Sequence, residues 1–205
     1  IHAYEIPEKV RGAGATLNSL VPKELESGED IISIHPISKT AKYFLFVTKK
    51  GKGKRVLIDE FTKSNRNGLI AIVLEESDSI CSIFTTSDEG SILMSADCNR
   101  VTHIPVSDFP TLGRATMGNY VFNVRSGPNE NSLVTSASFV LPGDENQAAL
   151  TISKEGFGKL TMITDYPLMS RDTMGVDPFA RKFGMDIAYF AILDNLKLAD
   201  ESVEA

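Results

Sequence analysis

A repeat with a period near 50 residues constrains this 205-residue chain more than any single segment does. Each of three stretches contains a tight turn, a short strand pattern, and an acidic residue beside an aromatic one. An arginine follows the acid by six residues, and a glycine comes shortly afterwards. The stretches are residues 49–68, 97–118 and 154–175, with acid–aromatic pairs Glu60-Phe61, Asp108-Phe109 and Asp165-Tyr166 and arginines Arg66, Arg114 and Arg171. The opening segment YEIPEKVRGAG, with Arg11 and Gly14, resembles a degraded further copy.

Short apolar and β-branched runs, separated by Gly, Asn, Asp or Pro clusters, predict strands along most of the chain. The predicted strands are residues 1–6, 31–34, 43–48, 54–58, 68–74, 79–84, 91–95, 100–106, 120–124, 133–140, 148–152 and 159–163. Residues 187–205 are the one serious helix candidate, although their first half could equally be a strand. Residues 185–193 could also complete the first repeat unit, which lacks a strand.

About four strands in each unit of about 50 residues are typical of propeller-like blades. We therefore expect an all-β fold of about four four-stranded blades. The expected single domain is 1–193, with blades at roughly 1–41, 42–90, 91–147 and 148–193, followed by an acidic tail at 194–205. A β-sandwich with coincidental internal similarity is the alternative.

Residues 42–66 carry a net charge of +6, whereas the whole chain carries −6. A local cationic patch on an acidic protein indicates an anionic partner. The candidate nucleic-acid contacts are the basic residues of this patch and of the equivalent positions in the other copies: Lys49, Lys50, Lys52, Lys54, Arg55, Lys63, Arg66, Arg100, Arg114, Lys159 and Arg171. Two other interpretations stay open. The lysine-rich turn could serve solubility, and the repeat arginines could pair with the acid six residues earlier.

Other classes of site have little support in the sequence. The three histidines and two cysteines are scattered and do not have the spacing of metal ligands. The sequence also contains no Walker loop and no nucleophile motif. We therefore predict no cofactor, no metal and no catalytic residue. No apolar run is long enough to span a membrane. Two cysteines fit a reducing compartment, which predicts a cytoplasmic location. Because the chain starts at Ile1 without Met, we expect a fragment or a processed product.

The stretches YFLFVTKKGKGKR and IDEFTKSNRNGLIAIVLEESD resemble the C-terminal repeat of bacterial type IIA DNA topoisomerase A subunits, and the likeness covers roughly residues 1–176. The resemblance implies a β-pinwheel, a propeller-like arc or closed ring whose blades exchange strands. It also implies binding and bending of double-stranded DNA without sequence specificity, and presentation of that DNA to a separate cleavage core. The implied partners are DNA, the rest of the topoisomerase A chain and, through that chain, the ATPase subunit, in the nucleoid.

One departure from the family pattern concerns a box rich in Gln, Arg, Gly and Lys that gyrase subunits carry. The corresponding segment here reads PLMSRDTMG, where only Arg171 and Gly175 are plausible equivalents. This favours a protein similar to topoisomerase IV, which decatenates and relaxes DNA, over gyrase. The acidic net charge is a second departure. The alternative function is a propeller-like module that binds proteins rather than DNA.

Overall fold

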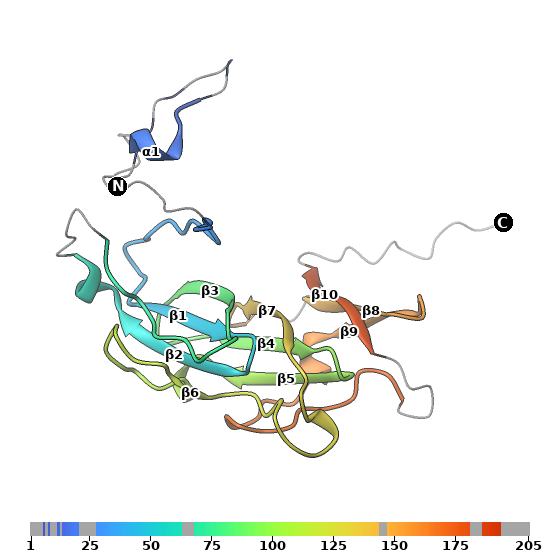
Figure 1. Ribbon diagram of the computed structural model, residues 1–205. Helices are drawn as coiled ribbons and strands as arrows, with labels where there is room; N and C mark the ends of the chain where they lie inside the picture. The colour runs from blue at the N-terminus through green and yellow to red at the C-terminus, as the bar shows by residue number, and fades with distance from the viewer. Residues whose placement is uncertain are drawn as a thin grey trace.

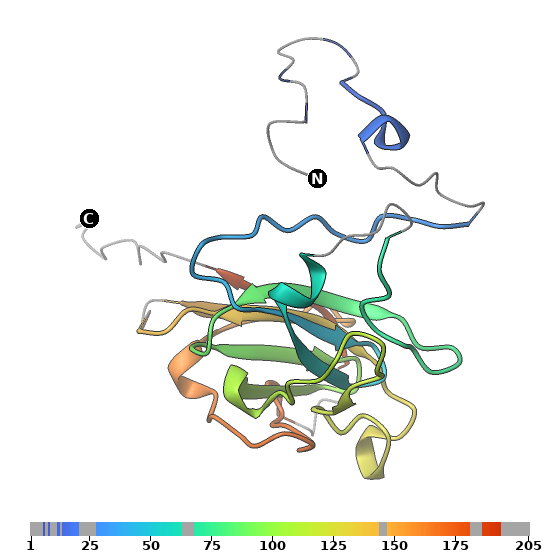
Figure 2. The same ribbon diagram turned by 90° about the vertical axis from the view of Figure 1, so that its left-hand side faces the viewer.

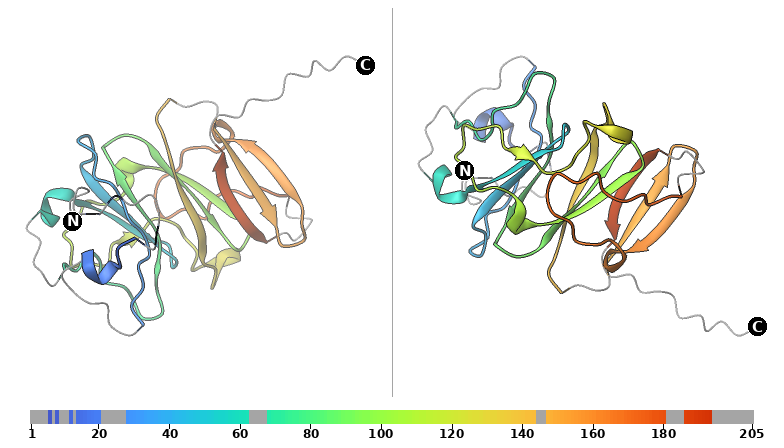
Figure 3. Two further views of the ribbon diagram at one scale, coloured as in Figure 1. Left: turned by 90° about the horizontal axis from the view of Figure 1, so that it is seen from above. Right: turned by 90° about the horizontal axis from the view of Figure 1, so that it is seen from below.

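The computed structural model of the chain describes residues 6, 8, 12, 14–20, 28–62, 68–143, 147–180 and 186–193. Within this part the protein consists of β-strands, short 3₁₀ turns and one single-turn helix, α1 (Leu17–Leu20). The strands form three small sheets that lie side by side in chain order (Figures 1 and 3). Residues 28–42 run across one side of the first sheet before the chain enters it (Figure 2).

The first sheet has the order β3-β1-β2-β6. It contains β1 (Tyr43–Thr48), β2 (Lys52–Leu57), β3 (Ile80–Thr86) and the two-residue β6 (Asn119–Tyr120). All its pairs are antiparallel, and β6 comes from the next repeat copy, more than 60 residues after β2.

The other two sheets each have three antiparallel strands, in the orders β5-β4-β7 and β10-β8-β9. The strands of the second sheet are β4 (Ser91–Ala96), β5 (Arg100–Pro105) and β7 (Val134–Val140). Those of the third are β8 (Ala148–Ser153), β9 (Gly158–Met162) and β10 (Ile187–Leu193). The all-β class and the division into small sheets are thus confirmed.

Several details differ from the expectation. Two sheets have three strands rather than four, and in the described residues before Tyr43 there is no strand, so 31–34 is not one. Residues 68–74 form no strand either. The expected first strand, 1–6, and the tail at 194–205 lie outside the described residues, Ile6 excepted. Residues 187–193 form a strand, which pairs with β8 of the third sheet rather than completing a first blade.

Two hydrophobic clusters fill the spaces between adjacent sheets, and β4 contributes to both. Ile92 and Met94 belong to the cluster shared with the first sheet, and Leu93 belongs to the cluster shared with the third. Successive side chains of a strand point to opposite faces, so a strand with a sheet on either side is apolar throughout. This explains why all six residues of β4 are buried. Complete burial of such a side chain stabilises the fold by about 1.5–3 kcal/mol.

The acid–aromatic pairs follow the outer long strand of each sheet, which is β2, β5 or β9, in or directly after a 3₁₀ turn. The turns are η2 (Ile58–Phe61), η3 (Val106–Asp108) and η5 (Ile163–Asp165), and the first residue of each is buried. Of the aromatic residues, Phe109 and Tyr166 are buried. Phe61 is half-buried and makes an edge-to-face contact with Phe44 at 5.1 Å between ring centroids.

After η3 and η5, the chain crosses onto the outer long strand of the preceding sheet, which is β2 or β5. We call residues 109–122 the first crossing segment and residues 166–179 the second. The first lies along β2: the Arg55 amide donates to the Pro110 carbonyl, and the Leu112 amide donates to the Arg55 carbonyl. The second lies along β5, where the Met169 amide donates to the His103 carbonyl, and Val101 and Val176 exchange two backbone hydrogen bonds.

The repeat glycine lies where each crossing segment comes closest to the neighbouring strand. Gly118 and Gly175 have φ angles of +84° and +74°. A Cβ atom on Gly118 would lie 2.8 Å from the Gly53 carbonyl oxygen, and one on Gly175 would lie 2.5 Å from the Val101 carbonyl oxygen. A larger side chain would therefore push the crossing segment off the strand.

We expect Gly175→Ala to lower the free energy of unfolding by more than the ~1–2 kcal/mol that a left-handed backbone alone costs an L-residue. Urea unfolding of Gly175→Ala and of a control variant measures this loss of stability. Gly143→Ala is the matched control, because Gly143 has the same φ of +74° but open space where a Cβ would lie. Equal losses for the two variants would contradict a cost from the close approach of the two backbones.

His103 on β5 also holds the second crossing segment. Its Nδ1 lies 3.1 Å from the Tyr166 carbonyl oxygen and its Nε2 lies 2.7 Å from the Ser91 hydroxyl. A carbonyl can only accept, so Nδ1 carries the proton and the Ser91 hydroxyl donates to Nε2. This pattern fits the neutral ring, and burial lowers the pKa of His103 below its usual 6.5.

Because the pKa of His103 is lower in the folded than in the unfolded chain, the unfolded chain takes up the proton first as the pH falls. The free energy of unfolding is therefore expected to decrease below pH 6.5, by at most ~1.4 kcal/mol per pH unit, and to gain nothing from this group above it. Midpoints of urea unfolding, measured from about pH 5.5 to 7.5 where histidine side chains commonly titrate, test this expectation. His103→Gln should flatten the profile, and His35→Gln, in the segment before the first sheet, is the control variant.

Candidate nucleic-acid interface

The turn between β1 and β2 presents the most accessible part of the cationic patch. Lys49 is exposed, and the Lys50 ammonium donates to the Glu76 backbone carbonyl at 2.5 Å. The carboxylate of Asp78 accepts the Lys50 backbone amide at 3.0 Å, which fixes the turn. Gly51, at φ +79°, closes the turn. The turn therefore holds two cations at the surface beside two acidic residues.

Lys52 and Arg55 point toward other parts of the protein. The Lys52 ammonium is hydrogen-bonded to Glu75 and lies 4.9 Å from the centroid of the Tyr120 ring. The hydrogen bond from Lys52 lowers the pKa of Glu75. The Arg55 Nε donates to the Phe109 carbonyl at 3.0 Å, and its guanidinium lies over the Tyr43 ring. Both cations thus fasten the first sheet to other segments.

Lys54 is completely buried beneath the first crossing segment. Its ammonium donates to the carbonyls of Gly113, at 2.9 Å, and Arg114, and to the Thr116 hydroxyl at 3.3 Å. Burial lowers the pKa of Lys54 to about 8, against the opposing effect of the Glu60 carboxylate. At neutral pH the amine keeps its proton and all three donors. Thr102 occupies the equivalent position on β5, and its hydroxyl oxygen lies 3.3 Å from the hydroxyl oxygen of Thr173 in the second crossing segment.

Arg100 and Arg114 lie at boundaries between repeat copies. The buried Arg100 donates to the Gly175 carbonyl at 3.1 Å and pairs with Asp177 at 3.2 Å. Arg114 lies 3.9 Å from the Glu60 carboxylate, which also accepts its backbone amide. Arg114 thus pairs with Glu60, the repeat acid of the preceding copy. It does not pair with Asp108, the acid six residues before it in its own copy.

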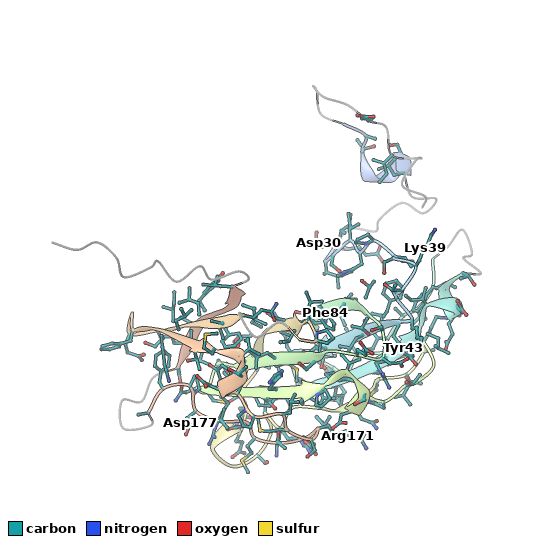
Figure 4. The ribbon with its side chains drawn as sticks, turned by 180° about the vertical axis from the view of Figure 1, so that it is seen from behind. Asp30, Lys39, Tyr43, Phe84, Arg171 and Asp177 are labelled. Atoms are coloured by element: carbon teal, nitrogen blue, oxygen red, sulfur yellow. The ribbon has the colours of Figure 1, made fainter. Side chains whose placement is uncertain are left out.

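The remaining candidates are more exposed or lie outside the described residues. Lys159 on β9 is exposed and donates to the Pro178 carbonyl at 3.1 Å. Arg171 is exposed at an edge of the molecule, on the opposite side from Asp30 and Lys39 (Figure 4). Lys63 and Arg66 fall in 63–67, which the structure does not describe. The candidates within the described residues therefore do not form one cluster.

The sequence interpretation missed Arg125, which joins two repeat copies. Its guanidinium makes a two-point contact with Asp172 at 2.7 and 2.9 Å and lies 3.8 Å from the centroid of the Tyr120 ring. The hydrogen bond to Asp172 raises the pKa of Arg125. Arg125 and Asp172 are 47 positions apart, and no local sequence pattern links them. The contact is therefore visible only in the folded chain.

The described residues contain no group of His, Cys, Asp and Glu side chains suited to hold a metal ion. None of the described helices has the length and apolar character needed to cross a membrane.

The burial of Lys54 predicts that this residue is structural. Lys54→Met should lower the free energy of unfolding by about 1–3 kcal/mol, because the hydrogen bonds from a charged donor to the Gly113 and Arg114 carbonyls are lost. Urea unfolding at neutral pH measures it, and Lys49→Met, on the exposed turn, should change stability by less than about 0.5 kcal/mol. Unchanged stability in Lys54→Met would contradict the structural role.

Comparison with known proteins gives a consistent family match. Three stretches, residues 42–87, 91–127 and 148–176, match the family described as "DNA gyrase C-terminal domain, beta-propeller", and together they cover more than half of the chain. The A subunit of DNA gyrase from Deinococcus deserti is 32% identical over 176 residues, which are 84% of this chain and 21% of that protein. The same gyrase protein of Staphylococcus aureus strain MRSA252 is 31% identical over 182 residues, 86% of this chain and 20% of that protein. The chain thus spans about a fifth of the length of these relatives.

Two solved structures share the fold. The C-terminal domain of DNA topoisomerase IV superposes with a TM-score of 0.73 at 18% identity, over 88% of this chain and 55% of that one. A DNA gyrase A C-terminal domain gives a TM-score of 0.67 at 20% identity, over 95% of this chain and 61% of that one. The fold is therefore that of these β-pinwheel domains.

Proposed function

The chain belongs to the DNA gyrase C-terminal β-propeller domain family, and on that premise we propose that it is an accessory domain of a type IIA topoisomerase A subunit that binds double-stranded DNA. The family match is the observation that carries this proposal. Binding would use the phosphate backbone, because lysines and arginines neutralise phosphates without reading base edges. The cleavage and ATPase activities would reside in other parts of the enzyme.

The proposed contacts are the candidate cations that remain accessible. Lys49 and Lys50 on the β1–β2 turn, Lys159 on β9 and Arg171 are at least partly exposed. Lys52, Lys54, Arg55, Arg100 and Arg114 are engaged within the protein, so phosphate contact by them would require breaking internal hydrogen bonds or ion pairs. Lys50 and Lys159 each donate to one backbone carbonyl, of Glu76 and Pro178, which phosphate contact would replace. Lys63 and Arg66 belong to the proposal by sequence only.

We further propose that the domain bends DNA and presents a segment to the cleavage core for decatenation and relaxation. Bending a site of 20–30 bp costs about 1–6 kcal/mol, which contacts with more than one blade would have to offset. The replacement of the gyrase box by PLMSRDTMG supports relaxation over supercoiling. The curated relatives described above are gyrase subunits, so this preference remains a prediction.

The test of DNA binding is fluorescence anisotropy on a labelled duplex of about 40 bp, long enough for a bend, titrated with salt. Lys49→Ala/Lys50→Ala should reduce the slope of log K against log salt by about 1.8, the value for two lost phosphate contacts. Lys42→Ala/Lys154→Ala is the control with the same change in charge, since these lysines pair with Asp88 and Asp186. Equal slopes for the two double variants would contradict contact at the turn.

A protein-binding module is the second candidate, and the charge arrangement favours it. Lys42, Lys52, Arg125 and Lys154 pair with carboxylates, and the chain carries a net charge of −6. These pairs leave few free cations in the described part of the chain. Absence of DNA binding at low salt would decide for this candidate.

A further inference from the structure

Residues 75–78, EESD, form an acidic turn that lies against the lysine-rich turn between β1 and β2. The Glu75 carboxylate is hydrogen-bonded to the Lys52 ammonium. The Glu76 carbonyl accepts a hydrogen bond from the Lys50 ammonium at 2.5 Å. Two cations of the patch are therefore engaged by a surface turn of the same chain.

The backbone and Asp78 hold this acidic turn in place. The Asp78 carboxylate accepts the backbone amides of Lys50 and Ser79 at 3.0 and 2.8 Å. The Lys49 amide donates to the Ser79 carbonyl at 2.8 Å, and the Asp78 amide donates to the Glu75 carbonyl at 3.0 Å. None of these bonds uses the Glu75 carboxylate. The Glu75 side chain can therefore rotate away while the backbone of the turn stays where it is.

Glu75 is the solvent-facing member of its ion pair. Its side chain is 33% exposed, whereas that of Lys52 is only 10% exposed. The hydrogen bond from Lys52 lowers the pKa of Glu75, so the carboxylate is ionised at neutral pH. The Tyr120 ring also lies against the ammonium, at 4.9 Å from the ring centroid. A phosphate that approaches Lys52 from solvent would therefore take the place of Glu75.

The second sheet provides the equivalent cation with its carboxylate in a different way. Arg100 on β5 corresponds to Lys52 on β2, because each follows the positive-φ residue that closes its hairpin turn. The carboxylate partner of Arg100 is Asp177, which lies in the second crossing segment two residues after the repeat glycine. The first crossing segment has Tyr120 at that place, so Lys52 takes its carboxylate from a separate surface turn. Loss of the contact with Glu75 would leave the crossing segment attached.

The buried position of Lys52 favours the exchange of one anion for another. Removing the partner of a buried charge is strongly destabilising, because the remaining charge is neither paired nor well hydrated. Phosphate oxygens accept hydrogen bonds from an ammonium group as carboxylate oxygens do. A duplex backbone can therefore replace the carboxylate without leaving the lysine unpaired.

We propose that Glu75 competes with the phosphates of double-stranded DNA for Lys52, so that DNA binding at the β1–β2 turn replaces this internal carboxylate by a phosphate. Glu75 then limits the affinity for DNA, and Lys52 becomes a phosphate contact only in the complex. The inference rests on the proposed function and concerns the regulation of the same site.

The test is the anisotropy titration on the labelled duplex, applied to Glu75→Gln. The amide keeps the shape of the side chain and removes its charge, so Lys52 no longer has to exchange one anion for another. We expect Glu75→Gln to bind the duplex more tightly than the unaltered chain at the same salt concentration. The expected gain is about fivefold, near the upper value for a partly exposed ion pair.

The same substitution in a Lys52→Gln background separates competition from a general effect of charge. Lys52→Gln alone should reduce the slope of log K against log salt by about 0.9, the value for one lost phosphate contact. Adding Glu75→Gln to it should then give no further gain in affinity. A general repulsion between Glu75 and DNA would give the same gain in both backgrounds.

Asp186→Asn is the matched control for the removal of one negative charge from an ion pair. Asp186 pairs with Lys154, whose side chain is 55% exposed and is not among the proposed contacts. Asp186→Asn should therefore change the affinity for DNA much less than Glu75→Gln does. This comparison does not depend on the Lys52 variant, and circular dichroism establishes that each variant is folded.

Three outcomes would overturn the competition. They are equal gains for Glu75→Gln with and without Lys52, an equal gain for Asp186→Asn, and no gain for Glu75→Gln in a chain that binds DNA. Each of these would leave the proposed function intact. Absence of DNA binding at low salt by the unaltered chain and by every variant would overturn both proposals, whereas binding by Glu75→Gln alone would support the competition.

Discussion

The attachment of each crossing segment to the outer strand of the preceding sheet is the interaction on which the rest of the structure depends. It hydrogen-bonds an edge that would otherwise be open, and it determines where the buried polar groups find partners. Lys54 and His103 are buried on outer strands because a neighbouring copy supplies carbonyl acceptors. The repeat positions Gly118 and Gly175 require glycine because the crossing segment and the neighbouring strand are in backbone contact there. The sheets are therefore held together by backbone pairing as well as by the two hydrophobic clusters.

This attachment also determines which cations remain available to a partner. Residues on β2 and β5 that face a crossing segment are used internally, as Arg100 is by Gly175 and Asp177. Lys49 in the β1–β2 turn stays exposed, although the nearby Gly51 carbonyl accepts the amides of Val121 and Phe122 from the first crossing segment. The accessible candidate cations are therefore Lys49 and Lys50 in the β1–β2 turn, Lys159 on β9 and Arg171 in the second crossing segment. The same division explains why net charge alone is a poor guide to its binding surface.

The fold was largely predictable from the sequence, whereas the candidate site was only partly so. The strands at 43–48, 91–95 and 148–152 were recognisable because apolar runs and turn residues are local signals. The inward orientation of Lys52 and Lys54 was not, because their partners lie 23 and 59 residues away. The prediction of a strand at 68–74 was wrong for a related reason: a strand needs a partner edge, and the sequence of one segment does not reveal whether that edge exists.

The sequence repeat and the sheets are out of phase, since the second and third copies each begin in one sheet and end on the sheet before it. Duplication or deletion of one whole copy in the gene would therefore create a junction with the same donor, acceptor and glycine spacing as the existing junctions. Domains of this architecture can thus gain or lose blades through recombination between repeats, and the length of the arc can evolve without redesign of its parts.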